Sequence, residues 1–411
     1  MTPSLADARA LDAADPLGPM RARFALPAGV VYLDGNSLGA LPAATPARVA
    51  AVVAEQWGRD LIGSWNVHDW IGAAARVGAR IAPLIGAAPH EVVVADSTSV
   101  NLFKLIAAAM AARPGRMTIL SEAGNFPTDL YVADGVASML PHARVRLAQA
   151  DDIAAVVDED TAVVVLTHVH YKSGRMLDMA ALTRAAQAAG ALVLWDLSHS
   201  VGAVPVALNA CGADLAVGCG YKYLNGGPGA PAFLFVAERH QATLRSPLSG
   251  WMGHAAPFAF TDEYRPAPGI DRFQCGTPSI LGLAALEEGV AMFEDVSFAD
   301  LVAKSRALTA LWIDCVEQRS AGHGFALASP RDPAARGSHV SFAHPDAYPI
   351  CRALIARGVI GDFRAPDVLR MGFTPLYTSF EDVWCAGDIL ADVMATGAWD
   401  HPEYRTRAAV T

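Results

Sequence analysis

An aspartate and a lysine follow two short apolar runs of the chain, and together they could serve one kind of chemistry. Asp196 closes the apolar run Leu192–Leu197, and Lys222 stands 26 positions later in GCGYKYLNGGPG. In an open α/β sheet, ligands bind at the carboxyl ends of the strands. Pyridoxal phosphate needs a lysine that couples to its aldehyde and a carboxylate that keeps its ring nitrogen protonated. A salt bridge at the sheet edge is the alternative interpretation, and this pair alone does not decide between the two.

A hydroxyl-rich segment indicates an anion site at the same edge. Asp96, Ser97, Thr98 and Ser99 follow an apolar run and open an expected helix, whose free backbone N–H groups favour anions. Thr167 ends another expected strand at that edge. An ordinary helix cap is the alternative interpretation. A cofactor that carries a phosphate would give the segment a function.

An aromatic side chain, an acid and an imidazole are further candidates for contact with a planar ring. Phe126 and Asp129 lie in GNFPTD, where the phenyl ring could stack on a cofactor and the carboxylate could reach a ring substituent. His199 stands three residues past Asp196 and could bond a cofactor or a carboxylate. A core phenylalanine and a polar residue at a helix start are the simpler alternatives.

Two further histidines suggest a rival chemistry. His168 and His170 alternate in THVHYKSG and would face one side of a strand, as in a metal-dependent hydrolase. No third ligand or catalytic carboxylate at suitable spacing is evident. We therefore predict no metal and assign the pair to the cofactor edge or a loop.

Arg370 lies inside the apolar run VLRMGF, where its charge needs a partner. The guanidinium fork is suited to a carboxylate, which could belong to a substrate. An internal ion pair is the alternative.

Composition excludes several classes of protein. The chain has 411 residues, of which 53% are hydrophobic and 18% charged, and its formal net charge is −10. A disordered chain and a basic nucleic-acid-binding surface are both excluded. Apolar runs are too short to span a membrane, and the N-terminus lacks the features of a signal peptide. The six cysteines are scattered without a C-x-x-C pair, which favours a reduced, cytoplasmic protein.

Short apolar runs alternate with alanine-rich helical patterns from Val92 onward, which predicts an α/β fold with a mostly parallel sheet. The expected strands are Val92–Ala95, Met117–Ser121, Val145–Leu147, Ala162–Thr167, Ala191–Trp195, Leu215–Cys219 and Ala232–Val236. The expected helices between them are Val100–Ala112, Thr128–Ser138, Ile153–Val157 and Ala180–Ala189.

The pattern changes after residue 299. A long helix at Asp300–Gln318 leads into strands at Ser338–Phe342 and Val368–Phe373, with a helix at Tyr348–Arg357. We expect an irregular N-terminal arm over residues 1–30, a large cofactor-binding domain over 31–299, and a small α+β domain over 300–411.

Motifs along nearly the whole chain resemble the kynureninase family of pyridoxal-phosphate hydrolases. The matching blocks are YLDGNSLGALP (32–42), STSVNLFKL (97–105), NFPTDLY (125–131), HVHYKSGRMLD (168–178), WDLSHSVGAVPV (195–206), GCGYKYLNGGPGA (218–230), GWMGH (250–254), CGTPSIL (275–281) and GDFRAPDVLRMGFTPLY (361–377). The resemblance implies the aspartate aminotransferase-like fold (fold type I). It also implies hydrolytic Cβ–Cγ cleavage of L-kynurenine to anthranilate and L-alanine, within tryptophan catabolism toward NAD.

The resemblance also implies a role for individual residues. Lys222 carries the cofactor, and Asp196 pairs with its ring nitrogen. From the chemistry of carbonyl hydration, Tyr221, or a water that it holds, is our candidate for proton transfer. The cofactor-binding set becomes Thr98, Ser99, Phe126, Asp129, Thr167, Asp196, His199, Tyr221, Lys222, Trp251 and Thr277. Arg370 grips the substrate carboxylate, and Trp65 and Ser37 complete the substrate side. Members of the family are homodimers whose sites draw on both chains.

Two positions bear on substrate choice, and two related activities remain as alternatives. Thr277 with Trp65 resembles the bacterial type of the family, which prefers kynurenine over 3-hydroxykynurenine. Cysteine desulfurases and aminotransferases share the fold and the cofactor. A desulfurase needs a nucleophilic cysteine on a mobile loop, whereas Cys351 lies in the helical run PICRAL.

Overall fold

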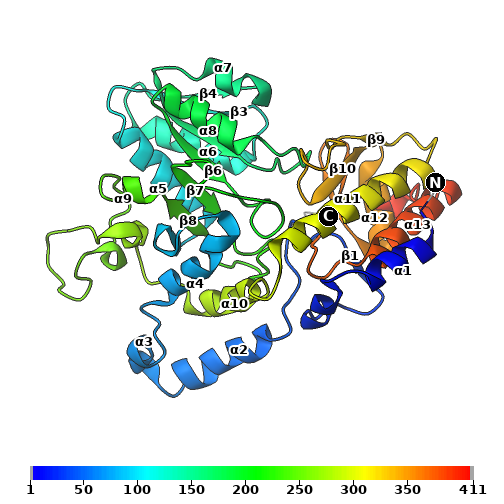
Figure 1. Ribbon diagram of the computed structural model, residues 1–411, viewed down its shortest axis with the longest axis horizontal. Coiled ribbons are helices and arrows are strands. Elements are labelled where there is room, and N and C mark those ends of the chain that lie inside the picture. The colour runs from blue at the N-terminus through cyan, green and yellow to red at the C-terminus, as the bar shows by residue number, and fades with distance from the viewer. Residues whose placement is uncertain (1–2, 408–411) are drawn as a thin grey trace.

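A seven-stranded mixed sheet forms the centre of the larger part of the computed structural model, which describes residues 3–407 (Figure 1). Its strands stand in the order β2-β8-β7-β6-β5-β3-β4. Their bounds are β2 (Val92–Val94), β3 (Thr118–Glu122), β4 (Arg144–Ala148), β5 (Thr161–Thr167), β6 (Leu192–Asp196), β7 (Leu215–Gly218) and β8 (Phe233–Val236). The five strands from β7 to β4 are parallel, and β8 is antiparallel to both of its neighbours. The predicted mostly parallel sheet is confirmed.

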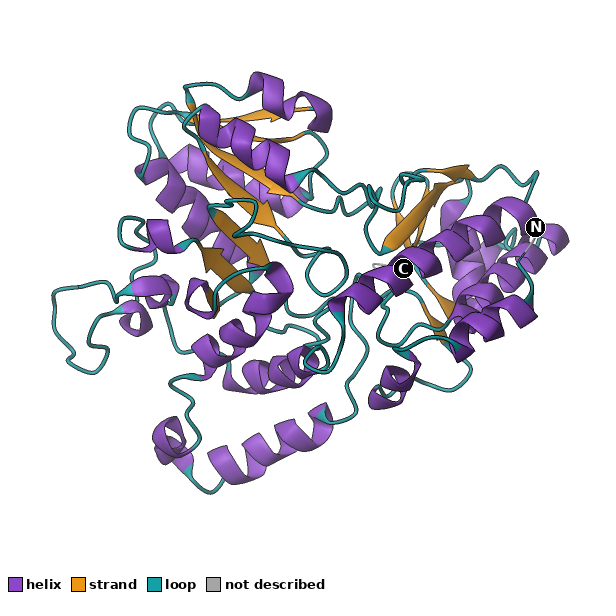
Figure 2. Ribbon diagram, in the orientation of Figure 1, coloured by secondary structure: helices purple, strands orange, loops and turns teal. Residues whose placement is uncertain are grey.

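Helices cover both faces of this sheet, as Figure 2 shows. Every residue of β5 and of β6 is buried, which explains why these strands are continuous apolar runs. The covering helices include α5 (Thr98–Ala111), α6 (Pro127–Met139), α7 (Ile153–Val156) and α8 (Met179–Ala188). Each predicted strand and helix of this region is present within about two residues of its expected ends.

A second, antiparallel sheet with its own hydrophobic core lies in the C-terminal part. Its strands stand in the order β12-β13-β10-β9, with the bounds β9 (Ala326–Leu327), β10 (His339–Ala343), β12 (Asp362–Arg364) and β13 (Val368–Gly372). The helices α11 (Phe298–Arg319), α12 (Ala347–Ala356), α13 (Phe380–Thr396) and α14 (Pro402–Arg405) belong to this part. Trp312, Phe342 and Met371 lie in its core. The α+β pattern is as predicted, and the exact domain limits stay a prediction.

The N-terminal segment is not irregular, so this part of the prediction was wrong. Leu5–Ala13 form α1, which begins at a capping box between Ser4 and Asp7. Ala8 is buried in the core of the C-terminal part, and α1 contacts α13 (Figure 1). The Asp15 carboxylate pairs with the Lys304 amine at 2.6 Å. Docking on a distant helix stabilises this short helix, and a local pattern could not reveal it.

The segment between the arm and the large sheet crosses between the two cores. β1 (Val31–Tyr32) pairs in parallel with β11 (Val359–Ile360) of the C-terminal part. The sequence did not predict the next three helices, α2 (Thr45–Ala51), α3 (Ser64–Val67) and α4 (Ala73–Ile81). It also did not predict two helices later in the chain, α9 (Glu238–Gln241) and α10 (Ile280–Ala291). Within residues 3–407, no helix has both the length and the apolar character needed to cross a membrane.

Candidate active site

Lys222 lies in the loop after β7 with its amine among aromatic rings. Its Nζ is 2.9 Å from Nε2 of His199. The ring centroids of Phe126 and Tyr221 lie 5.9 Å and 5.8 Å from the same nitrogen. The side chain is buried, with 9% of its surface exposed. The amine is therefore enclosed without being held by a carboxylate.

The other lysines are engaged elsewhere. Lys104 and Lys304 are buried and pair with Asp96 and Asp15. Lys172 donates to the carbonyl of Ala365 at 2.7 Å. In the part of the chain that the structure describes, only Lys222 has an amine in contact with neither a carboxylate nor a backbone carbonyl.

Two buried carboxylates, one at the end of a strand and one in the first turn of a helix, lie near Thr167. Asp196 is the last residue of β6 and lies directly opposite Thr167, the last residue of β5. Asp129, in the first turn of α6, accepts a hydrogen bond from Thr167 Oγ1 at 3.3 Å. Both acids are nearly inaccessible, and burial together with the negative charge of Asp196 raises the pKa of Asp129. A protonated ring nitrogen is the kind of group that would neutralise such a pair.

His199 offers a further free ring atom. Burial, followed by the positive charge of Lys222, lowers the pKa of His199 well below its usual range, so the imidazole is neutral. Its Nδ1 is buried and has no hydrogen-bond partner among the described residues. The acids, the imidazole and the amine therefore fit the ring of pyridoxal phosphate, with Phe126 as an aromatic neighbour.

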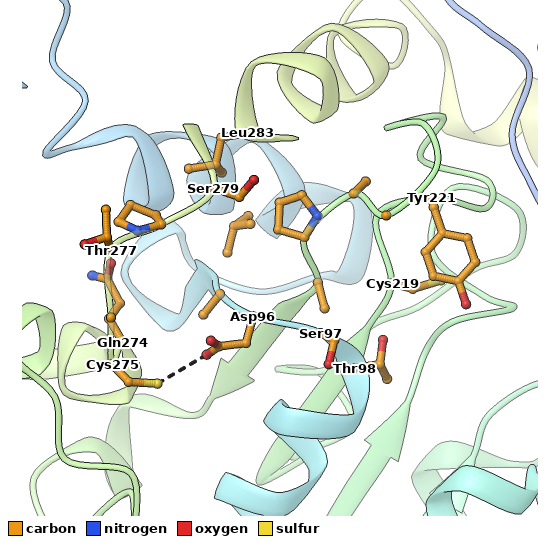
Figure 3. A pocket seen from close by; sticks show the side chains of 18 residues that line it. Asp96, Ser97, Thr98, Cys219, Tyr221, Gln274, Cys275, Thr277, Ser279 and Leu283 are labelled. Atoms are coloured by element: carbon orange, nitrogen blue, oxygen red, sulfur yellow. Dashed lines mark hydrogen bonds between the residues drawn. The ribbon is translucent and has the colours of Figure 1, made fainter. Parts of the chain in front are cut away.

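A cavity of about 500 Å³ lies beside this group at the N-terminus of α5 (Figure 3). Ser97, Thr98, Tyr221 and Thr277 contribute polar side chains to its lining, while Ser99 does not. The Ser97 hydroxyl accepts a hydrogen bond from the Val100 N–H at 3.4 Å and so caps the helix. Hydroxyls and a helix N-terminus are suited to a phosphate group. Lys222 is absent from the lining, but its neighbour Tyr221 reaches into the cavity.

Trp65, Trp251 and Thr277 meet in a second pocket of about 620 Å³. The rings of the two tryptophans are 6.4 Å apart and nearly perpendicular. The rest of the lining comes from Ile62, Asn66, Ile71, Phe258 and Phe260. Thr277 borders both pockets, so the residues predicted to choose the substrate lie at one boundary.

Arg370 is fully buried and already has a carboxylate partner within the chain. The pairing of β12 with β13 places it directly opposite Asp362, whose Oδ1 accepts from Nε at 2.8 Å. Its Nη2 donates to the second Asp362 oxygen and to Ser37 Oγ, the latter at 2.9 Å. The internal ion pair kept as the alternative is therefore present. Sequence reasoning missed Asp362, although the Pro366-Asp367 turn between the two strands was a signal for a hairpin.

His168 and His170 do not form the start of a metal site. His168 Nδ1 is 2.9 Å from the Ser200 hydroxyl, and His170 Nε2 is 2.9 Å from the Gly124 carbonyl. Across residues 3–407, no group of three or more histidine, cysteine or acidic side chains could hold a metal ion.

Comparisons with solved structures agree on the fold. A cysteine desulfurase from Thermococcus onnurineus NA1 matches with a TM-score of 0.77 at 19% identity, covering 92% of this chain and 98% of that chain. A cystine C–S lyase in complex with its product cysteine persulfide matches with a TM-score of 0.76 at 16% identity, covering 89% and 98%. At identities this low, the comparisons establish only the fold. The structural similarity confirms the predicted fold type I.

Sequence comparisons identify the family. Residues 301–390 match the model of the kynureninase C-terminal domain. A kynureninase of Burkholderia mallei (strain SAVP1) is 52% identical over 411 residues, covering 98% of this chain and 99% of the relative. One of Pseudomonas fluorescens is 51% identical over the same shares. With this identity over nearly its whole length, the chain belongs to the kynureninase family.

Proposed function

We propose that this protein uses pyridoxal phosphate to hydrolyse L-kynurenine to anthranilate and L-alanine. The observation that carries the proposal is the enclosed Lys222 amine next to His199, at the end of the sheet where Asp196 and Asp129 are buried together. Membership in the kynureninase family supports the substrate. In the reaction, water adds to the γ-carbonyl carbon, and the Cβ–Cγ bond breaks.

The chain's own residues have separable tasks in this reaction. Pyridoxal phosphate, when bound, supplies an electron sink for the substrate carbon skeleton. Asp196 keeps the ring nitrogen protonated, and the amine of Lys222 takes and returns the proton at the substrate α-carbon. Tyr221, or a water that it holds, moves protons at the γ-carbonyl. Burial raises the pKa of Tyr221, so its hydroxyl stays protonated at neutral pH.

The remaining assignments divide between cofactor and substrate. Phe126 would hold the cofactor ring from one side, and Asp129, Thr167 and His199 would hold its substituents. For the phosphate side we propose Thr98, Tyr221 and Thr277, with Ser97 in place of Ser99, while Trp251 lines the aromatic pocket instead. Arg370 and Ser37 bind the substrate carboxylate, and Trp65 lies against the substrate aryl ring. The placement of Thr98, Tyr221 and Thr277 around one cavity supports the phosphate assignment for these three residues.

The desulfurase alternative lacks support at the expected cysteine. Cys351 lies in α12 and is completely buried, and burial raises the pKa of its thiol. A desulfurase needs an accessible thiolate. The metal-hydrolase alternative lacks a third ligand beside His168 and His170 within the described range.

We also propose a homodimer in the cytoplasm. Large apolar side chains are exposed near the aromatic pocket: Ile62 (81%) in the 3-10 helix Leu61–Gly63, Val67 (71%) at the end of α3, and Phe258 (60%) and Phe260 (79%) in one loop. Exposed apolar surface of this kind is typical of an interface, and a second copy would cover it beside Trp65 and Thr277. The six free cysteines fit a reducing compartment.

A product assay with the cofactor-loaded protein tests the proposed activity. L-kynurenine should give anthranilate and L-alanine in equal amounts, without a 2-oxo acid and with no effect of a metal chelator. Lys222→Ala should abolish both products. Transfer of the amino group to a 2-oxo acid, sulfide release from cysteine, or inactivation by the chelator would each favour an alternative activity.

A further inference from the structure

Two guanidinium groups share one buried carboxylate next to the proposed substrate site. Arg370 and Arg364 both donate to Asp362, the latter from Nη2 at 2.6 Å. Both also donate to the Ser37 hydroxyl, at 2.9 Å from Arg370 and 3.2 Å from Arg364. Asp34 is the other acid of this cluster. Burial and the charge of Asp362 raise its pKa to about 7, so this carboxyl is only partly ionised at neutral pH. Two guanidinium groups therefore share one ionised carboxylate, Asp362, and one partly protonated carboxyl, Asp34, which leaves the cluster with a net positive charge.

Arg370 has few donors left for a ligand. Nε and Nη2 are engaged with Asp362 and Ser37, and Nη1 donates to the carbonyl of Tyr171. Only 1% of the side chain is exposed. A guanidinium has five N–H donors, and most of those of Arg370 serve to hold the fold.

Arg364 has more unused donors than Arg370, and its side chain is more exposed. Its two hydrogen bonds both start from Nη2, and 36% of its side chain is exposed. Its Nε is buried without a partner among the described residues. Burial, followed by the positive charge of Arg370, lowers the pKa of Arg364. An added carboxylate would pair with Nη1, which makes no hydrogen bond to another described residue, and would offset the excess charge.

A chain of contacts leads from Arg364 to the reactive lysine. Arg370, which shares Asp362 with Arg364, donates to the carbonyl of Tyr171, and the Tyr171 ring packs edge-on against Phe126 with centroids 5.3 Å apart. Phe126 in turn lies over the Lys222 amine. From the other side, the N–H of Gly39, two residues past Ser37, donates to the Tyr221 carbonyl at 2.8 Å.

The Ser37 hydroxyl donates its own proton to Asp362 at 2.9 Å and so helps to hold the cluster. We propose that Arg364 is a second substrate-binding cation, which takes the α-carboxylate of the amino-acid substrate. Asp362 acts as a positioning residue that holds Arg364 and Arg370 at a fixed spacing. The proposal rests on the proposed function for the identity of the substrate. Part of the carboxylate contact assigned above to the buried Arg370 then belongs to the more accessible guanidinium of Arg364.

The test compares ligands that differ only in the carboxylate. Arg364→Gln, Arg364→Lys and the unmodified holoenzyme are titrated with L-kynurenine and with the amine analogue that lacks its α-carboxyl group. Inhibition of cleavage gives the affinity of the amine, and KM and kcat are measured for L-kynurenine. Arg357→Gln is the matched control, because Arg357 is an arginine of the same part of the chain that pairs with Asp392 at the surface.

In Arg364→Gln, we expect the preference for L-kynurenine over the amine analogue to fall by about tenfold or more, mainly through a higher KM for L-kynurenine. Arg364→Lys should show a preference between those of Arg364→Gln and the unmodified enzyme. Affinity for the amine analogue and all values of Arg357→Gln should stay within about twofold. A preference that falls less than about fivefold, or an equal loss for both ligands, would overturn the proposal. Failure of the unmodified enzyme to cleave kynurenine would instead refute the proposed function. Direct dialysis of both ligands would then still test Arg364.

Discussion

The amine of Lys222 lies 2.9 Å from Nε2 of His199, a neutral imidazole whose second ring nitrogen is buried without a partner in the described range. A neutral imidazole accepts a hydrogen bond from the amine without fixing it as a salt bridge would. The amine therefore stays available for covalent coupling, with Asp196 and Asp129 buried together at the same end of the sheet. This relationship distinguishes Lys222 from Lys104 and Lys304, which carboxylates hold.

Asp196→Asn should fold and bind the cofactor but lose most of its activity. The amide cannot keep the ring nitrogen protonated, so the electron sink is weaker at the moment of proton removal. We expect a loss of roughly 10²-fold or more in kcat, in line with the removal of an electrostatic contact from an active site. The measurement is kcat at saturating cofactor, with cofactor content checked by absorbance. Near-normal turnover would make Asp196 a structural residue only.

Arg370→Lys should impair kynurenine handling although the charge is kept. An ammonium cannot reproduce the two-pronged contact with Asp362 or the bonds to Ser37 and Tyr171. We expect kcat/KM to fall by a factor that corresponds to about 2–4 kcal/mol of lost transition-state binding. The cofactor absorbance should not change. An altered cofactor spectrum with normal substrate kinetics would contradict a role on the substrate side.

Stability should fall in mildly acidic solution because buried histidines must remain neutral. Burial lowers the pKa of His168 from 6.5 to about 4. Between these values the unfolded chain binds a proton that the folded chain does not. The stabilisation is thus complete above pH 6.5 and is lost as the pH falls toward 4. The contribution changes by about 1.4 kcal/mol per pH unit.

His168→Gln isolates this contribution. The variant should be less stable than the unmodified protein at pH 7.5, and the gap between their urea midpoints should narrow at pH 5.5 and again at pH 4.5. Because both proteins contain Asp34, which titrates in the opposite sense, its effect cancels in the difference. A constant gap for His168→Gln would mean that this imidazole can take a proton in the folded state.

Kynurenine should be preferred over 3-hydroxykynurenine. Thr277 and Trp65 line one pocket, and an extra ring hydroxyl would meet the bulk of the tryptophan. A buried hydroxyl without a partner costs about 1–3 kcal/mol, so the preference should be roughly tenfold or more. Thr277→Asn combined with Trp65→His should narrow or invert it. Competition assays give the ratio of kcat/KM, and equal values for the two substrates would refute the specificity proposal alone.

The large sheet was predictable because its strands are buried on both faces. Runs such as Leu192–Asp196 contain little besides apolar residues, and each ends in a side chain that leaves the sheet at the edge where the site forms. Asp196, Thr167 and Lys222 could therefore be placed together from the sequence. Thr98 followed from the helix start at the same edge.

Contacts between distant segments could not be predicted in the same way. The helix Leu5–Ala13 packs against α13, and this contact cannot be inferred from the residue pattern of Leu5–Ala13 alone. The partner of Arg370 became evident only once the register of β12 and β13 set Asp362 opposite it. Ser99 was grouped with the phosphate contacts through its neighbours, yet the cavity lining includes Ser97 in its place.

The most direct test of the account is to locate the lysine that carries pyridoxal phosphate. The purified holoenzyme should absorb near ~420 nm, and borohydride should fix the cofactor to the chain and remove this band. Peptide mapping by mass spectrometry should then find the adduct on Lys222, and Lys222→Ala should yield none. An adduct on Lys104, Lys172 or Lys304, or a protein that cleaves kynurenine without any fixed cofactor, would contradict the account.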